Sequence, residues 1–477
     1  MTGNAVVPIV FFGWIPAAQG LFAFLTPRRA VVVALVGGWL FLPNATFKFS
    51  GLPDYTKVTA VVTAILVGVF LFDRRRFRTF RARWYDIPML IFCLSPMASS
   101  IDNGLGTYDG FSCVLSHLMK WGMPYFIGRV YFNSYEGMCD LAMAIFVGGL
   151  IYIPLCLYEI RMSPRLHKSL YGFRTRSPHL GFRDGGYRPM VFLWSFVPVA
   201  HWMSVTTAAG YWLWRGARLR LLWGMPVGLL LLVMIITVFL CKTYLAYVLV
   251  PLGIVLAAMM IKTRRSWPLL VFVVLVPTFM GLRISGVVSG EALIDTVSKV
   301  NETRARSLGT RIRNENEIAE KAMRRPIFGW GRWSRWMIQD EKGRDQTIPD
   351  GLWVITLGQQ GLLGLVAFVS IYAIALWRVA GKMNGYTDKA MVAPAAAVAT
   401  VVLLTFINIV PNTTFSPIIT AALGGLIAME RYCPPSISPE VRSMVAQGTA
   451  GSAPQLRGRA RGSREPGPTP TNLDRIG

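Results

Sequence analysis

Long apolar runs recur along nearly the whole of this chain. Many approach the roughly 20 residues of helix that cross a hydrocarbon layer about 30 Å thick. Only 15% of the 477 residues are charged and 53% are hydrophobic, whereas soluble domains average about 25% charged residues. This composition excludes a water-soluble protein. The sequence therefore predicts an all-α fold, a polytopic membrane bundle of about 12–13 spans.

Two polar gaps separate the apolar runs, and a polar tail follows them. The chain is therefore divided into six regions. We expect spans near 5–25, 30–43, 56–72, 86–100, 108–128, 138–158, 190–213, 220–240, 243–261, 266–283, 351–378, 390–410 and 412–430. The predicted organisation is N-terminal spans (1–158), an external basic loop (159–189), central spans (190–283), a large external loop with short helices (284–350), C-terminal spans (351–430) and a disordered cytoplasmic tail (431–477). The first run has no preceding basic segment, so we expect it to be retained.

Basic residues in short loops give the orientation of the spans, because such loops stay in the cytoplasm. Arginines and lysines gather at 28–29, 74–83, 215–220 and 262–265. If the spans alternate, 159–189 and 284–350 then lie outside, although both are rich in Lys and Arg. An inverted topology over 159–189 is the alternative.

The formal charge of +25 would favour nucleic-acid binding in a soluble protein. In a membrane chain, cations beside the outer leaflet suit an anionic, membrane-bound ligand, and we expect no nucleic-acid partner. The basic tail is either attracted to lipid headgroups or simply solvated. The six cysteines form no CxxC pair, so no zinc site or disulfide framework is indicated. We expect no metal and no cofactor.

The second outer loop contains an unusual concentration of aromatic and basic residues. The apolar positions of 318–323 favour a short amphipathic helix, which Pro326 would end, and Gly329-Trp330-Gly331-Arg332-Trp333 follows. Glycines allow a ligand to approach the backbone closely. The indoles of Trp330 and Trp333 suit sugar rings, and Arg332 suits phosphate oxygens. The alternative is an aromatic belt at the bilayer surface.

These motifs carry a resemblance to a known family. The order of these motifs resembles that of the O-antigen ligase and polymerase family, whose members are lipid-linked glycan transferases of the GT-C type. The motifs are Arg311, a short helix, Pro326, Gly329-x-Gly331 and then Gly361-Leu362-Leu363-Gly364. Gly185-Gly186-Tyr187-Arg188-Pro189 is similar to the arginine-containing element that this family carries in its first outer loop. The resemblance covers 170–365 by motif and the remaining residues by hydropathy.

The resemblance implies glycosyl transfer on the outer face of the cytoplasmic (inner) membrane. The donor would be a glycan on a polyprenyl pyrophosphate, and the acceptor a hydroxyl of a glycan, lipid or protein. The reaction would invert the anomeric carbon and need no metal. The resemblance assigns Arg188 and Arg311 as pyrophosphate-holding residues, with Arg183 and Arg313 as further candidates by proximity. Arg332 is a candidate on the same ground, and Lys242 adds a cation at the outer surface. Plain surface charge is the alternative for each.

One position departs from the family pattern. The family carries a His eleven residues before the Gly-Leu-x-Gly element, and Asp350 occupies that position here. A carboxylate can accept the proton of an acceptor hydroxyl; the alternative is an N-cap for the helix that starts near Gly351. Ligase and polymerase remain equally open. The alternative function is a transporter or flippase for an anionic solute, which would favour charge within spans and an internal repeat.

Overall fold

A computed structural model describes residues 3–49, 53–288, 290–299, 302–332, 334–384 and 389–429. These residues belong to one compact unit, Met1–Tyr432. The second unit, Cys433–Gly477, lies outside the described residues, and so does the tail expected over 431–477.

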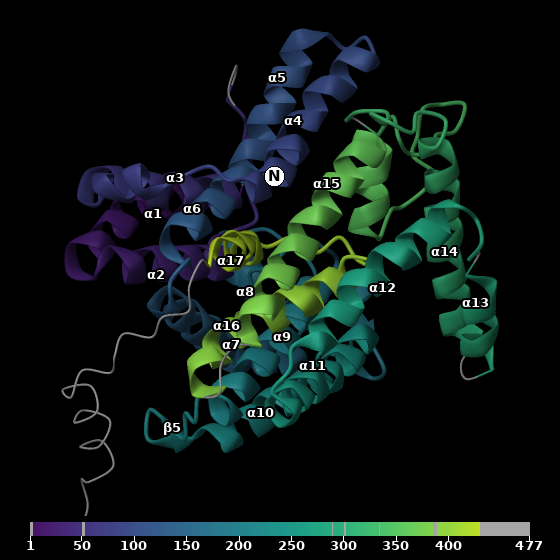
Figure 1. The fold of residues 1–477 in the computed structure, drawn as a ribbon. Coiled ribbons are helices and arrows are strands. Elements are labelled where there is room, and N and C mark those ends of the chain that lie inside the picture. Colours follow the sequence, from purple (N-terminus) through teal and green to yellow (C-terminus); the bar gives the residue numbers. More distant parts are fainter. Residues whose placement is uncertain are drawn as a thin grey trace, which may run out of the picture. The chain divides into compact units, whose positions relative to one another are not determined.

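Within the described residues, a helix occupies each of the thirteen segments expected to be spans, so the all-α prediction is confirmed (Figure 1). The helices are α1 (Val6–Phe24), α2 (Pro27–Phe41), α3 (Lys57–Phe72), α4 (Ile87–Asp102), α5 (Gly106–His117), α6 (Met123–Tyr131), α7 (Tyr135–Met162), α9 (Phe196–Arg215), α10 (Val227–Leu240), α11 (Tyr244–Thr263), α12 (Trp267–Ile284), α15 (Leu352–Met383), α16 (Lys389–Asn408) and α17 (Pro417–Ala428). A π-helical turn, Leu118–Gly122, joins α5 to α6, which together fill one expected segment.

The remaining elements are short or lie in the polar gaps. They are α8 (Leu166–Tyr171), α13 (Glu291–Ser298), α14 (Glu302–Ala322), the 3-10 helices Arg74–Thr79, Trp84–Asp86 and Pro178–Gly181, and three antiparallel hairpins: β1 (Thr46–Phe47) with β2 (Tyr55–Thr56), β3 (Phe182–Arg183) with β4 (Gly186–Tyr187), and β5 (Leu221–Leu222) with β6 (Met225–Pro226).

The helices differ in whether they alone are long enough for a bilayer. Among the described residues, six are both long and apolar enough to cross one: α1, α7, α11, α12, α15 and the part of α16 from Ala390. Shorter apolar helices are α3, α10 and α17. The chain is therefore a multi-pass membrane protein in which long spans are accompanied by shorter helices.

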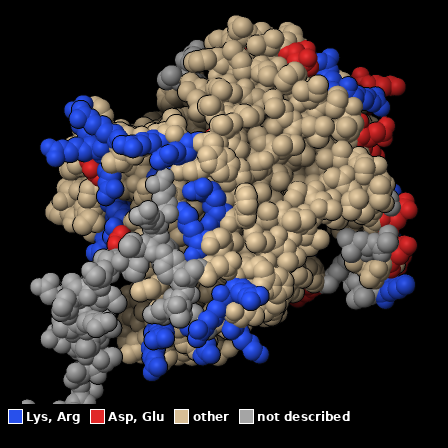
Figure 2. Space-filling view, in the orientation of Figure 1, with Lys and Arg blue, Asp and Glu red and all other residues tan. Residues whose placement is uncertain are grey.

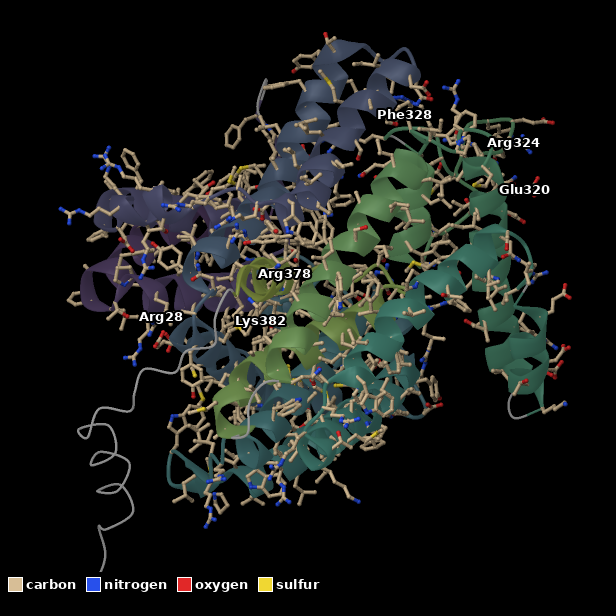
Figure 3. All side chains as sticks on the ribbon, in the orientation of Figure 1. Arg28, Glu320, Arg324, Phe328, Arg378 and Lys382 are labelled. Atoms are coloured by element: carbon tan, nitrogen blue, oxygen red, sulfur yellow. The ribbon has the colours of Figure 1, made fainter. Side chains whose placement is uncertain are left out.

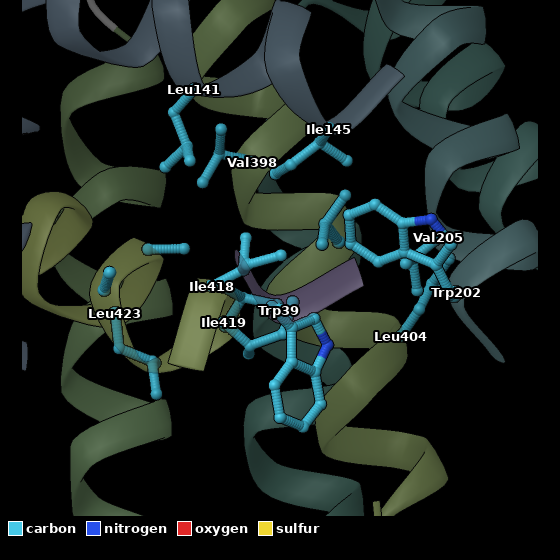
Figure 4. Close-up of a cluster of buried hydrophobic side chains, with 14 of the residues drawn as sticks. Trp39, Leu141, Ile145, Trp202, Val205, Val398, Leu404, Ile418, Ile419 and Leu423 are labelled. Atoms are coloured by element: carbon cyan, nitrogen blue, oxygen red, sulfur yellow. The ribbon is translucent and has the colours of Figure 1, made fainter. Parts of the chain in front are cut away.

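The core is apolar and lies where helices from both halves of the chain meet. Figure 4 shows part of it: side chains from α2, α7, α9, α16 and α17 interdigitate around Trp39 and Trp202. Most of the α16 side chains between Val392 and Thr405 are fully buried. A helix that is apolar on all sides must be covered by other helices or lipid, so α16 forms the centre of the bundle.

Residues that the charge pattern assigns to opposite faces lie at opposite ends of the unit. Figure 3 shows Arg28 and Lys382 far from Glu320, Arg324 and Phe328. Figure 2 shows many Lys and Arg side chains at the lower left, where α2 and β5 are labelled in Figure 1, and side chains of both signs at the upper right. Which of these regions faces the outside of the cell stays a prediction from the basic loops.

The helix in the second outer loop is longer than the short one expected over 318–323. α14 has 21 residues and ends at Ala322, before Pro326. Its buried apolar residues include Ala305, Ile312 and Ile318. Because many polar residues separate them, the apolar pattern alone does not predict the N-terminal turns of this helix. The extra turns bring Arg311 onto a regular helix.

Candidate active site

The first outer loop is tied to the membrane bundle by one buried carboxylate. Glu159, near the end of α7, is only 1% exposed. It accepts hydrogen bonds from the backbone N–H groups of Leu166 (2.9 Å), Met190 (2.7 Å) and Val191 (2.7 Å). A buried carboxylate is stable only when its oxygens are bonded in this way. Glu159 therefore fixes both ends of the segment that contains Arg188.

The centre of this segment is the β3–β4 hairpin. Its two turn residues, Asp184 and Gly185, have φ values of 49° and 75°, as tight two-residue hairpins require. The backbone N–H of Arg188 then donates to the carbonyl oxygen of Gly181 at 2.9 Å. The hairpin thus places Arg183 on β3 and Arg188 directly after β4.

Arg188 is buried although it carries a charge. It is 6% exposed, its Nη2 donates to Thr243 Oγ1 at 2.7 Å, and its guanidinium lies 5.0 Å from the centre of the Phe196 ring. Its Nε has no hydrogen-bond partner among the described residues. Burial lowers the pKa of Arg188 to about 10, with further lowering from the positive charges of Arg183 and Arg311. The group therefore stays protonated at neutral pH.

Lys242 joins this cluster from the turn between α10 and α11. Its Nζ donates to the carbonyl oxygen of Asp184 at 2.8 Å, and Arg183 Nη1 donates to the Lys242 carbonyl oxygen at 3.5 Å. The guanidinium of Arg183 also lies 5.4 Å from the centre of the Tyr244 ring. The structure therefore brings three predicted cations, from two separate segments, into one place.

The second outer loop supplies Arg311 and Asp350, which form an ion pair. Arg311 Nε lies 3.3 Å from Asp350 Oδ2, and Asn314 Nδ2 donates to the carbonyl oxygen of Ile348 at 3.3 Å, which ties α14 to the segment before Asp350. Burial raises the pKa of Asp350, while the positive charges of Arg311 and Arg176 lower it. Asp350 and Arg188 thus both lie within the electrostatic range of Arg311.

Asp350 does not cap the helix that follows it. The N-cap of α15 is Gly351, with no side-chain hydrogen bond. The backbone N–H of Leu352 instead donates to the carbonyl oxygens of Ile409 (3.0 Å) and Asn412 (3.3 Å). The N-cap alternative for Asp350 was therefore wrong, because backbone carbonyls between α16 and α17 satisfy the helix start, and the carboxylate faces Arg311.

Three charged residues near this site were missed by the sequence analysis. Glu315, on α14, is 8% exposed, and its Oε2 lies 3.3 Å from Nη2 of Arg283 at the end of α12. The positive charge of Arg176 lowers the pKa of Asp350. The four-residue spacing from Arg311 to Glu315 puts both residues on one face of α14. A predicted helix long enough to include both positions would have shown that they are neighbours.

The glycine motifs form a single backbone junction. φ/ψ values at Gly361 are not helical and divide α15 into two parts. Backbone N–H and C=O groups of α15 on both sides of this break form hydrogen bonds with the segment from Pro326 to Gly331. The bonds are Trp330 N–H to Gly358 O (2.8 Å), Gly331 N–H to Gln359 O (3.0 Å), Leu362 N–H to Pro326 O (2.6 Å) and Leu363 N–H to Ile327 O (3.2 Å). The junction explains structurally why the two motifs occur together.

Both glycines at this junction are required by space as well as by conformation. Gly329 has φ 71°, and a Cβ there would lie 2.6 Å from the nitrogen of Gly361. Gly361 has φ 66°, and a Cβ there would collide with the backbone of Ile327. Any side chain would push the two segments apart, so the role of these glycines is to allow the backbones to touch.

The aromatic and basic residues of this motif lie apart from the Arg188 cluster. Trp330 is half-buried and donates from Nε1 to the carbonyl oxygen of Lys321 at 2.9 Å. Arg332 lies beside Cys113 and His117, with which it lines a small pocket; its predicted role in substrate binding stays a prediction. Trp333 lies outside the described residues.

Arg313 makes its side-chain hydrogen bond within its own helix. It is exposed, and its Nε donates to the carbonyl oxygen of Gly309 in its own helix at 3.4 Å. Residues two apart on a helix point about 200° away from each other. Because Arg311 faces Asp350, Arg313 must face outward.

Comparison with known proteins identifies one family. Residues 229–369 match the model of the family described as O-antigen ligase. The matched residues run from α10 into α15 and include Lys242, Arg311, Asp350 and both glycine motifs, whereas Arg188 lies before them. No curated protein matches the chain. Over residues 229–369, the chain is therefore similar to the O-antigen ligase family.

Proposed function

We propose that this protein transfers or polymerises a glycan from a polyprenyl-pyrophosphate donor onto an acceptor hydroxyl, on the external face of the cytoplasmic membrane. One observation carries the proposal. The positive charge of Arg311 lowers the pKa of Arg188, which belongs to the first loop, and Arg311 is itself ion-paired with Asp350 in the second loop. This observation supports a site in which two cations and a candidate base from separate segments act together, as a reaction with an anionic leaving group requires.

The arginines would stabilise the leaving group. As the glycosidic C–O bond to phosphate breaks, negative charge grows on the diphosphate oxygens, and fixed cations beside those oxygens lower the barrier. Arginine suits this role because it stays charged and binds phosphate in a planar, bidentate manner. Arg188 and Arg311 would hold the diphosphate, and Arg183 and Lys242 would extend the positive field.

Asp350 would act as the base. Its carboxylate would take the proton of the acceptor hydroxyl while the hydroxyl oxygen forms a bond to the anomeric carbon, and the electron pair of the breaking bond would leave with the lipid diphosphate. Attack from the opposite side inverts the anomeric carbon. This step uses side chains alone, without a metal. The acceptor is the hydroxyl of a glycan, lipid or protein.

The test is transfer by the purified protein in proteoliposomes that contain a lipid-linked glycan. We expect the wild-type protein to join donor glycan to acceptor, and R311A to lose about 100-fold or more of the rate at unchanged abundance. R306A is the matched control, because Arg306 lies on the same helix but pairs with exposed Glu302. Full activity of R311A would refute the assigned role, and movement of the lipid across the bilayer without transfer would support a flippase instead.

Products formed in cells distinguish the two reactions. In a deletion strain, loss of long chains with single units still transferred would indicate a polymerase, whereas accumulation of unattached long chains would indicate a ligase.

A further inference from the structure

A second carboxyl group lies beside Asp350 but comes from a different element. The side chain of Glu315 extends from α14, and a Cβ placed on Gly351 would lie 2.9 Å from Glu315 Oε1. Its other oxygen, Oε2, pairs with Arg283 at 3.3 Å. One oxygen thus faces the residue next to Asp350, and the other faces a cation at the end of α12.

The two carboxyl groups have unequal surroundings. Asp350 is half-buried, pairs with Arg311 and also feels Arg176. Glu315 is almost fully buried, its direct cation is Arg283, and Asp350 itself is a neighbouring negative charge. Two adjacent carboxylates repel, so one of them tends to keep a proton, and desolvation favours the neutral form of the more buried one. That group is Glu315.

The charged groups that act on Glu315 come from α12, from α14 itself and from the segment before α15. α12 provides Arg283, α14 provides Arg311, and the segment before α15 provides Asp350; the nearby indole of Trp353 is neutral. Burial raises the pKa of Glu315 to about 7, Asp350 raises it, and the two arginines lower it. The raised pKa of Glu315 therefore agrees with its burial and with its position beside Asp350.

We propose that Glu315 is the second carboxyl group of the active site: it holds one proton beside Asp350, so that Asp350 is the ionised base and the neighbouring arginines keep their charge for the diphosphate. This inference rests on the proposed transferase function. Pairs of carboxyl groups whose surroundings separate their protonation states divide acid and base roles in this way.

The proton balance of one turnover follows from this arrangement. Before transfer the pair holds one proton, on Glu315. Asp350 then takes the acceptor proton, so the pair holds two protons and the negative charge that favoured the neutral form of Glu315 is gone. Glu315 releases its proton to water, and the proton on Asp350 passes to Glu315, which restores the starting state. One proton leaves for each glycosidic bond formed.

A purely structural role is the competing explanation, in which ionised Glu315 only clamps α12 to α14 through Arg283. The variant E315Q separates the two. Glutamine has the same shape, still accepts a hydrogen bond from Arg283 and is permanently uncharged, so it mimics the protonated state. E320Q is the matched control, since Glu320 lies on the same helix, is exposed and pairs only with Arg324 among the described residues.

The first measurement is the donor KM between pH 6 and pH 8. A diphosphate esterified at both ends keeps a constant charge in this range, so any change belongs to the protein. We expect the wild-type and E320Q donor KM to rise about tenfold as Glu315 loses its proton, or about 1.4 kcal/mol, and that of E315Q to stay within about twofold of its pH 6 value. The same rise in E315Q, or no rise in the wild type, would overturn the proposal.

The second measurement does not depend on transfer. Infrared difference spectra of the full-length protein in detergent, recorded between pH 5.5 and pH 8.5, should show a protonated carboxyl band that titrates near neutrality in the wild type and E320Q and is missing in E315Q. Binding of a P1,P2-dialkyl diphosphate should weaken over the same range. If transfer is never observed but this band titrates, the proposed function fails while the assignment of the proton stands; absence of the band refutes that assignment.

Discussion

At the scale of single residues, the candidate site combines one buried charge, Arg188, with a partly exposed ion pair, Arg311 and Asp350. Arg188 is buried against Phe196 and bonded to Thr243, and Asp350 pairs with Arg311. Burial of an ionised group is costly unless partners offset it. These groups are therefore placed by the fold for electrostatic work, and each can be tested by substitution.

Replacing Asp350 tests the proposed base. We expect D350N to lower kcat by about 100- to 10,000-fold, the usual contribution of a general base, because the amide cannot accept the proton. D350H should retain much more activity, since imidazole is the group that the related family carries at this position. Transfer assays at fixed donor concentration give the comparison, with D345N in the same loop as the control. Near-normal turnover by D350N would remove Asp350 from the mechanism.

Replacing Arg188 tests the diphosphate site from the first outer loop. R188A should lower kcat/KM by about 100- to 1,000-fold, as loss of one stabilising donor does elsewhere. R188K keeps the charge but loses the planar fork, so its activity should fall between the two. Steady-state kinetics of the purified variants provide the measurement. Arg174 is exposed in the same loop, and R174A should behave as wild type; a loss equal to that of R188A would point to general surface charge.

Residue spacing explains which site residues the sequence revealed. Arg183, Arg188 and Lys242 carry a charge in short segments that sit beside apolar runs, and the structure brings these three predicted residues together. Arg313 and Arg332 were added because they are near Arg311 in sequence. Helix geometry turns Arg313 away from the site. Arg332 follows the glycine junction to a different set of helices, which sequence distance alone does not show.

At the scale of elements, the main feature is the break in α15. The hydropathy pattern is continuous through Gly361 and predicts one long span, and only the positive φ and the backbone contact with Ile327 identify the break. Backbone N–H and C=O groups inside a membrane protein must be paired. The loop from Pro326 to Gly331 supplies those partners, so the loop and the helix form one structural element.

Substitution of Gly361 tests this view. G361A must adopt a backbone conformation unfavourable for a side chain and also displace Ile327, so we expect it to lose about 1–3 kcal/mol of stability. Thermal unfolding in detergent gives the measurement, followed by fluorescence. Gly381 lies later in the same helix, and a Cβ there has no neighbour within 4 Å. G381A should therefore leave the unfolding temperature unchanged or raise it slightly, and an equal loss in both variants would contradict the explanation.

At the scale of the whole molecule, hydropathy and charge predicted the arrangement well. A helix fills each of the thirteen segments expected within the described residues, and residues expected on opposite faces lie at opposite ends. What these patterns do not contain is the contact between loops far apart in sequence. The positive charge of Arg311 reaches Arg188, which comes from a loop far away in sequence, and no periodic pattern reports that.

Labelling from outside the cell tests the orientation. In a background with its native cysteines replaced by serine, a cysteine introduced at Lys342 should react with a membrane-impermeant maleimide in intact cells. A cysteine at Arg218 should react only after lysis. Both positions are exposed, so access alone decides the result. The reverse pattern would place the proposed active site inside the cell and exclude its proposed reaction.

The shared backbone junction has a consequence for how the two glycine motifs change during evolution. Since Gly329 and Gly361 occupy the same small volume from opposite sides, a larger residue at either one separates the same pair of segments. The second replacement then finds the space already opened, so the two costs should not add in a double-mutant cycle. Among diverging homologues, the two positions are expected to be lost together or kept together, and their joint presence indicates an intact junction more reliably than either one does alone.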